Sequence, residues 1–292
     1  MQIYQALDRA KSLGLEVFDR QILLLHCLGQ STHNKAFLIS HDLDSLTREQ
    51  ELKFNELIQR CSAGEPVSYL IGVKEFFGLD FKVSPATLIP RPDTETLVDW
   101  ALECIKQDFK NSDNTNSPRK ILDLGTGSGC IAISLGISIK NAQVWATDLS
   151  ETALEVAREN ASTHRLKINF CQGFWFEALG NAQVKTPFDL IVSNPPYIAE
   201  QDPHLADLTF EPKGALVSGK NGLDAFKIIL GSAPQYLKPG GWLLFEHGYD
   251  QGETLRSLFV EHGFESVQSR MDLAGICRCT GGIRPKNGII EP

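Results

Sequence analysis

The segment that most constrains the fold is an apolar run that ends in three closely spaced glycines. Residues 121–132 are Ile-Leu-Asp-Leu-Gly-Thr-Gly-Ser-Gly-Cys-Ile-Ala. Apolar residues on either side of a glycine-rich turn predict a strand, a loop and a helix. Glycine lets the backbone adopt positive φ and pass close to a ligand. The spacing is one residue shorter than the dinucleotide fingerprint Gly-x-Gly-x-x-Gly, so the loop indicates a nucleotide cofactor without identifying its kind.

Strand and helix patterns alternate after Arg119. Strands are expected near residues 120–124, 143–147, 167–171, 188–193, 241–246, 264–270 and 275–280, and helices near 129–139, 151–163, 222–236 and 250–262. Such alternation is typical of an α/β fold with a mostly parallel sheet and helices on both faces. Ligands of these folds bind beyond the carboxyl ends of the strands. Because Gly125, Asp148 and Asn194 all lie at predicted strand ends, we expect them to share one crevice.

Residues 1–72 are expected to form a separate, small helical domain. A helix over residues 18–28 has apolar residues at helical spacing. A second helix is expected to begin at Thr47, with Leu52, Leu57 and Ile58 facing the core. Residues 76–83, interrupted at Gly78, predict a β-hairpin. We therefore expect a hairpin linker at 73–83 between the helical domain and a second domain at 84–292.

Composition limits the classes of function. No apolar run approaches the length of a membrane span, and the N-terminus lacks the apolar centre of a signal peptide. The 7 cysteines include no Cys-x-x-Cys pair, so reduced thiols and a cytoplasmic location are expected. The net charge of −8 argues against tight, non-specific binding to a nucleic-acid backbone. No metal is expected, because His, Cys, Asp and Glu show no ligand spacing.

The tetrapeptide Asn194-Pro195-Pro196-Tyr197 closes the predicted strand at 188–193. Prolines supply no backbone N–H, so this turn is rich in acceptors. A planar –NH2 group could donate one hydrogen to Asn194 and the other to the carbonyl of Pro195, while its π face meets Tyr197. The alternative is a purely structural role, as a rigid Pro-Pro turn after a buried strand.

Asp148 ends the apolar run at 142–147. An acidic residue at the end of the second strand is well placed to accept hydrogen bonds from ribose hydroxyls. Alternatively it is the N-terminal residue of the helix that follows, although Ser150 could cap that helix instead.

With Pro90-Arg91-Pro92-Asp93-Thr94-Glu95 added to these motifs, the chain resembles the peptide chain release factor glutamine methyltransferases, the protein-glutamine N5-methyltransferase family. The resemblance extends from about Ile3 to Thr280. Asn-Pro-Pro-Tyr alone is shared with adenine-N6 and other amino methyltransferases. The segment 90–95, the N-terminal helical module and the segment from Phe210 to Asp224 are more particular to this family.

The resemblance implies a Rossmann-like, S-adenosylmethionine-dependent methyltransferase domain. It implies methyl transfer to the side-chain nitrogen (N5) of the glutamine in the Gly-Gly-Gln motif of class 1 release factors, the proteins of translation termination. The helical domain would grip this protein substrate. Neither direct nucleic-acid binding nor a membrane partner is expected.

The resemblance also implies residue roles. The loop beneath the methionine part of S-adenosylmethionine would comprise Gly125, Thr126, Gly127, Ser128 and Gly129. Asp148 would hold the ribose, Trp175 would lie along the adenine, and Asn194 would touch both cofactor and substrate. The substrate site would comprise Asn194, Pro195, Pro196 and Tyr197, with Asn194 and Pro195 as the catalytic acceptors. The sequence departs from the family at Phe174, where an acidic residue is frequent, and in the tail from Gly281 to Pro292, which resembles nothing functional.

Three other functions stay open on the sequence alone. An adenine-N6 methyltransferase acting on nucleic acid would use the same four residues, but it should also need a positively charged groove. An NAD-dependent oxidoreductase is disfavoured by the short glycine spacing. A non-catalytic cofactor-binding module would be compatible with an intact Asn194.

Overall fold

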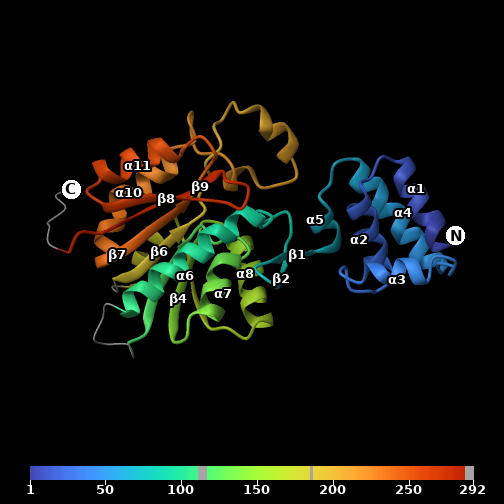
Figure 1. Ribbon diagram of the computed structural model, residues 1–292, viewed down its shortest axis with the longest axis horizontal. Helices are drawn as coiled ribbons and strands as arrows, with labels where there is room; N and C mark the ends of the chain where they lie inside the picture. Colours follow the sequence, from blue (N-terminus) through green and yellow to red (C-terminus); the bar gives the residue numbers. More distant parts are fainter. Residues whose placement is uncertain (111–116, 185–186, 287–292) are drawn as a thin grey trace. The chain divides into compact units, whose positions relative to one another are not determined.

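The computed structural model describes residues 1–110, 117–184 and 187–286 (Figure 1). The chain divides into two compact units, Met1–Val73 and Lys74–Pro292. Among the described residues, no helix is long and apolar enough to cross a membrane.

The first unit is helical, with α1 (Ile3–Ser12), α2 (Val17–Cys27), α3 (Lys35–Ser40), α4 (Arg48–Ser62) and α5 (Val67–Ile71). Thr47 and Gln50 form a capping box at the start of α4, since each side chain accepts from the other's backbone N–H. Phe54, Leu57 and Ile58 are buried in the core of this unit. The prediction that Leu52 faces inward is wrong, because it is 61% exposed. Two residues correspond to about 200° around a helix, which places Leu52 opposite the stripe that begins at Phe54.

A β-hairpin follows, with β1 (Val73–Phe76) and β2 (Leu79–Lys82). Its two turn residues, Phe77 and Gly78, have φ values of 53° and 73°. Positive φ at both central residues matches the twist of paired strands. The predicted hairpin is present with its turn at Gly78, but its first strand, Val73–Phe76, begins before the predicted range 76–83.

The second unit is built on a mixed sheet. In the described residues it has 7 strands in the order β5-β4-β3-β6-β7-β9-β8. These are β3 (Arg119–Leu124), β4 (Ala142–Asp148), β5 (Ile168–Gln172), β6 (Phe188–Ser193), β7 (Leu237–Glu246), β8 (Glu265–Met271) and β9 (Cys277–Ile283). β3 to β7 are parallel, and β9 pairs antiparallel with β7 and β8. The predicted Rossmann-like α/β fold is confirmed.

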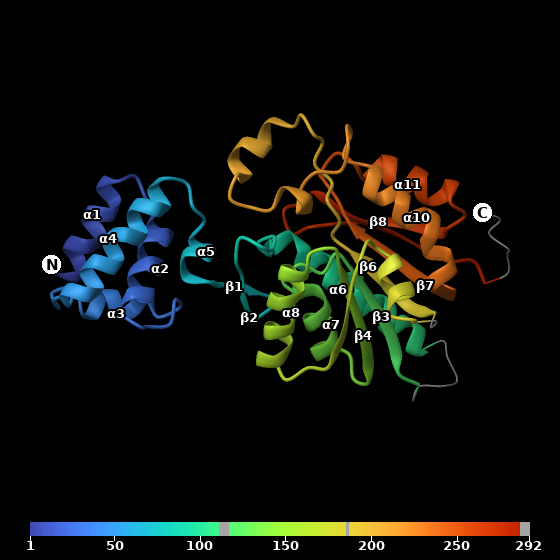
Figure 2. The same ribbon diagram turned by 180° about the vertical axis from the view of Figure 1, so that it is seen from behind.

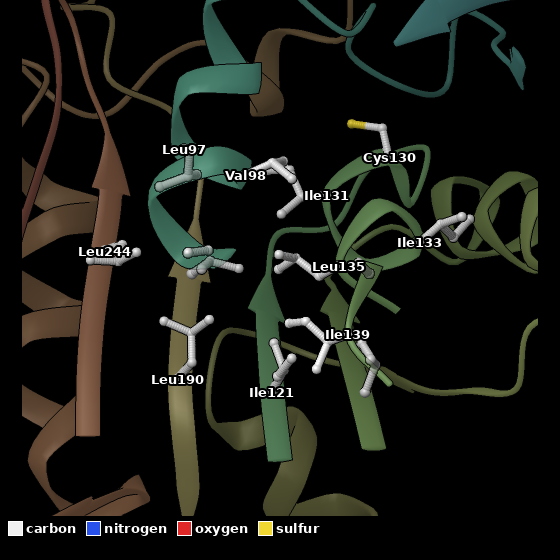
Figure 3. Close-up of a cluster of buried hydrophobic side chains, with 14 of the residues drawn as sticks. Leu97, Val98, Ile121, Cys130, Ile131, Ile133, Leu135, Ile139, Leu190 and Leu244 are labelled. Atoms are coloured by element: carbon white, nitrogen blue, oxygen red, sulfur yellow. The ribbon is translucent and has the colours of Figure 1, made fainter. Parts of the chain in front are cut away.

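Helices cover both faces of this sheet (Figures 1 and 2). One face carries α6 (Glu95–Lys110), α7 (Cys130–Ser138) and α8 (Glu151–Thr163), and the other carries α9 (Glu177–Asn181), α10 (Asp224–Tyr236) and α11 (Gly252–Glu261). Alternate strand residues serve the two cores: Ile121 joins the first and Leu122 the second. Figure 3 shows Ile121, Leu190 and Leu244 gathered with Leu97, Ile131 and Leu135 in the first core. Short 3-10 turns, η1 (Pro92–Thr94), η2 (Pro203–Leu208) and η3 (Lys213–Ala215), lie in the connections.

The last strand extends further than the sequence indicates. β9 runs to Ile283, so Gly281 and Gly282 belong to the sheet rather than to a featureless tail. A Cβ atom on Gly281 would lie 2.7 Å from the carbonyl oxygen of Leu243, so only glycine fits against β7 at this point. The end of the tail, from residue 287, lies outside the described residues.

Candidate active site

The carboxyl ends of β3, β4 and β6 meet at one edge of the sheet. Leu124 is paired with Thr147 of β4 on one side and with Ser193 of β6 on the other. The strand order reverses between β3 and β6, and a cavity of about 470 Å³ lies there. This is the crevice in which doubly wound sheets bind ligands.

Most of the residues expected at the site line this cavity. They are Gly125, Thr126, Gly127, Ser128, Asp148, Trp175, Asn194 and Pro196. The other three lie nearby, outside the cavity lining. Gly129 is the N-cap residue of α7, Pro195 is buried, and Tyr197 is half-buried with its carbonyl accepting from Nε2 of Gln251 at 3.0 Å.

The glycine loop is tied to the end of β4. The N–H groups of Gly125 and Thr126 both donate to the Thr147 carbonyl, at 2.8 and 2.9 Å. Gly129 has φ of 83°, and a Cβ atom there would lie 3.2 Å from the Cβ of Ala157 on α8. Glycine is therefore required both by the backbone turn and by the closeness of α7 to α8.

Asp148 is held by the backbone on both oxygens. Oδ2 accepts from the N–H of Gly127 and Oδ1 from the N–H of Ser150, each at 2.9 Å. Burial raises the pKa of Asp148, and these backbone donors partly offset that rise. Ser150 is the residue that caps α8, since its Oγ accepts from the N–H of Ala153 at 3.1 Å. Each Asp148 oxygen keeps a lone pair with which a ligand hydroxyl can bond.

Two aromatic rings border the cavity on the loop after β5. Trp175 has φ of 45°, in the left-handed region, which costs on the order of 1 kcal/mol for a bulky residue. Its Cζ3 lies 3.3 Å from where a Cβ of Gly125 would be, so the indole lies against the glycine loop. The ring of Phe174 is 5.7 Å from it between centroids and is 41% exposed. The wall here offers flat apolar surface to a planar ligand.

Several buried polar atoms on the cavity wall have no hydrogen-bond partner among the described residues. They are Ser128 Oγ, Thr147 Oγ1, Trp175 Nε1 and Asn194 Oδ1. Each unpaired buried group costs about 1–3 kcal/mol. A polar ligand with both donors and acceptors would relieve that cost, which fits a nucleoside-containing cofactor.

The cavity also uses two segments whose roles were not assigned from the sequence. Leu88, Pro90, Arg91 and Thr94 line it from the segment before α6. Pro212, Ala215 and Ser218 line it from the segment before α10, together with Asp224, the first residue of α10. Glu211 links the two segments, because its carboxylate forms an ion pair with Arg91 and accepts a hydrogen bond from the N–H of Ile89 at 3.1 Å. The family-like motifs at 90–95 and 210–224 were the available signal.

The turn after β6 is hydrogen-bonded to the segment before α10. The N–H of Ile198 donates to the carbonyl of Leu216, and the N–H of Ser218 donates to the carbonyl of Ile198, both at 2.9 Å. Asn194 Nδ2 donates to Thr94 Oγ1 at 3.4 Å. The side chain of Asn194 is therefore oriented from the segment before α6.

Comparison with known proteins gives consistent results. The family model "Methyltransferase domain" matches residues 115–280, and "PrmC N-terminal domain" matches residues 2–72. Proteins named release factor glutamine methyltransferase from Bordetella pertussis and Xylella fastidiosa (strain 9a5c) are each 45% identical. The alignments cover 92% of this chain and 95% of the first relative, and 96% of this chain and 98% of the second.

Two solved structures share the fold. A methyltransferase from Pyrococcus furiosus has a TM-score of 0.51 at 20% identity, covering 78% of this chain and 97% of its own. The N-terminal domain of human METTL16 in complex with SAH has a TM-score of 0.54 at 18% identity, covering 79% and 84%. At these identities the likeness concerns the fold alone.

Proposed function

Because the chain belongs to the family of release factor glutamine methyltransferases, we propose that it methylates the side-chain N5 of the Gly-Gly-Gln glutamine in class 1 peptide chain release factors, with S-adenosylmethionine as the methyl donor. The names of the relatives favour this reaction over adenine-N6 methylation of nucleic acid. A role in translation termination would place the protein in the cytoplasm.

The observation that supports the cofactor best is the set of unpaired polar atoms around a cavity at the strand-order reversal. The residues proposed to hold it are Gly125, Thr126, Gly127, Ser128, Gly129, Asp148, Trp175 and Asn194. Asp148 would accept hydrogen bonds from the ribose hydroxyls, and the indole of Trp175 would lie along the adenine. When bound, S-adenosylmethionine supplies an electrophilic methyl group on a sulfonium. Gly129 contributes indirectly, by letting α7 begin next to the loop.

Asn194 and Pro195 are proposed to prepare the nucleophile. An amide nitrogen is a poor nucleophile because its lone pair is delocalised into the carbonyl. Asn194 Oδ1, unpaired at the cavity wall, accepts one N–H of the glutamine, and the Pro195 carbonyl accepts the other, although Pro195 is not itself a lining residue. Pro196 and Tyr197 complete the substrate site.

These two acceptors act mainly in the transition state. As the N–C bond forms and the S–C bond breaks, positive charge grows on the nitrogen and both hydrogen bonds strengthen. The nitrogen can then pyramidalise, and in-line alignment contributes the remainder. The proton leaves to water after transfer, and S-adenosylhomocysteine is the other product.

Residues 1–72 are proposed to bind the release factor outside the methylated loop. This unit matches the PrmC N-terminal domain. It also has well-exposed apolar side chains, which are Val17, Phe18, Ile39, Leu43 and Leu52. A protein partner could cover these side chains on binding.

Labelled S-adenosylmethionine tests the proposed reaction. The protein is incubated with a purified class 1 release factor, and with the same factor carrying Gly-Gly-Ala in place of Gly-Gly-Gln. We expect label only in the first. Equal labelling of both would exclude the proposed glutamine.

A further inference from the structure

A buried carboxylate lies beside Asn194. Glu246 is the last residue of β7 and is 2% exposed. Parallel strands β6 and β7 pair Ser193 with Phe245, so the next residues along, Asn194 and Glu246, are neighbours at the same sheet edge. The charge of such a buried side chain is costly to desolvate unless it is paired or hydrogen-bonded.

Thr94 completes a group of three side chains. It is 3% exposed in η1, and its Oγ1 accepts from Asn194 Nδ2 at 3.4 Å. The Thr94 hydroxyl and the Asn194 amide both lower the pKa of the Glu246 carboxyl group, so both lie close to it, while Glu246 Oε2 is without a hydrogen-bond partner among the described residues. Asn194 Nδ2 is therefore turned toward Thr94, on the side of the site where Glu246 is buried. Asn194 Oδ1 is the atom of this amide that is left without a partner among the described residues.

We propose that Glu246 is a positioning residue that fixes which end of the Asn194 amide faces the substrate, an inference that rests on the function proposed above. A carboxylate only accepts hydrogen bonds. It therefore requires Thr94 to donate its hydroxyl hydrogen and Asn194 to turn Nδ2 inward. Oδ1 is then held as the acceptor for the glutamine amide.

Protonated Glu246 no longer fixes the orientation of the Asn194 amide. A protonated carboxyl can donate to Thr94 or to Asn194, so the amide is free to turn over and present Nδ2, which repels an N–H. The pKa of Glu246 is raised to about 7: burial is the largest cause and the Asp93 carboxylate adds to it, while Thr94, Arg278 and Asn194 lower it. Because the ionised form is the positioning form, methyl transfer should rise with pH through about 7 and then level off.

Ionisable groups of several elements interact with Glu246. They are Asp93 of η1, Cys130 of α7, Tyr197 of the turn after β6, and Arg278 and Cys279 of β9. Burial raises the pKa values of Cys130, Tyr197 and Cys279, so these three stay neutral near pH 7. The pKa of Arg278 is raised, and it stays charged.

The test is a pH profile of kcat for the full-length protein with a release factor, for wild type, Glu246→Gln and Asn194→Ala, and for the double variant. Gln keeps the shape of Glu but can donate. We expect Glu246→Gln to lower kcat about tenfold at pH 8 and to lose the acidic limb, with the affinity for S-adenosylmethionine changed less than about twofold. In the Asn194→Ala background, the same substitution should change kcat less than about twofold, because its effect acts through Asn194.

Thr94 supplies a second test should Glu246→Gln fail to fold. Thr94→Ser keeps the hydroxyl and should keep most of the activity, whereas the near-isosteric Thr94→Val should lower kcat about tenfold. Equal kcat for these two variants would overturn the proposal.

Three further results would overturn it: normal kcat in Glu246→Gln, an acidic limb that persists in that variant, or an equal loss in the Asn194→Ala background. A persistent limb would belong to another buried group, such as Asp123, whose pKa is also raised to about 7. Failure of the proposed function is distinguishable, because wild-type protein would then methylate no release factor at any pH.

Discussion

The carboxylate of Asp148 accepts a hydrogen bond from the backbone N–H of Gly127 at 2.9 Å. This contact joins the end of β4 to the glycine loop that follows β3. The N–H of Ser150 holds the other oxygen at the same distance. The side chain is thus fixed before a ligand binds, and a preorganised acceptor loses less entropy on binding.

Asp148→Ala should weaken S-adenosylmethionine binding by about 1–3 kcal/mol, because the ribose loses its acceptor and the Gly127 N–H loses its partner. Asp148→Asn, which retains one acceptor oxygen, should fall between wild type and Ala. Isothermal titration calorimetry measures both. Unchanged affinity in a folded Asp148→Ala protein would remove this residue from the cofactor site.

Asn194→Ala should lower turnover by roughly 10²–10³, the usual effect of deleting one preorganised transition-state partner. Because Asn194→Asp restores an acceptor, we expect it to be impaired less than Ala. It should still fall below wild type, because it places a second carboxylate beside Glu246. Steady-state methyl transfer to a release factor measures both. Near-normal turnover by a folded Asn194→Ala protein would contradict the proposed acceptor role.

A large part of the fold follows from sequence pattern. Helix α8, predicted at 151–163, is observed over Glu151–Thr163, because its cap at Ser150 and its apolar spacing are local signals. Strand β6, predicted at 188–193, is observed over Phe188–Ser193. β9 extends beyond its predicted end because Gly281 and Gly282 have the composition of a loop, and only their fit against β7 shows otherwise.

The site was less accessible from the sequence. The positions of Gly125, Asp148 and Asn194 at predicted strand ends indicated that they share one crevice, and all three line the same cavity. Thr94 and Glu246 were not assigned to it, because their contacts with Asn194 depend on how distant segments pack. Thr94 precedes Asn194 by 100 residues, and Glu246 reaches it only through the pairing of β6 with β7. No local pattern encodes either contact.

Asp123→Asn should stabilise the protein at pH 8. Asp123 is fully buried, and burial raises its pKa from 3.8 to about 7 in the folded protein, even though Thr126 Oγ1 donates to it at 2.6 Å. The folded state therefore binds a proton more tightly than the unfolded state. The free energy of unfolding falls as pH rises from about 4 to about 7, in total by an amount on the order of a few kcal/mol.

Asparagine at position 123 keeps an acceptor for Thr126 and carries no charge. The free energy of unfolding of Asp123→Asn should therefore not fall with pH on account of this residue. Urea denaturation at pH 5 and pH 8 measures the effect. The stability advantage of Asp123→Asn over wild type should grow between the two pH values. An advantage that stays constant or shrinks would show that Asp123 is not a raised-pKa group.

Ile39→Glu should raise KM for an intact release factor about tenfold, because Ile39 is 78% exposed in the unit proposed to bind that factor. Its affinity for S-adenosylmethionine should be unchanged. Val260→Glu is the matched control, since Val260 is an exposed apolar residue on α11 of the other unit. A release-factor KM equal to wild type in Ile39→Glu, or raised equally in both variants, would contradict a docking role for Ile39.

The central claim is that the methyl group goes to the side-chain nitrogen of one glutamine. Fragmentation mass spectrometry of the Gly-Gly-Gln peptide, recovered from a release factor after incubation with the protein and S-adenosylmethionine, tests it most directly. The predicted result is a mass gain of one methyl group located on the glutamine side chain. An unmodified peptide, or a methyl group located on any other residue, would contradict it.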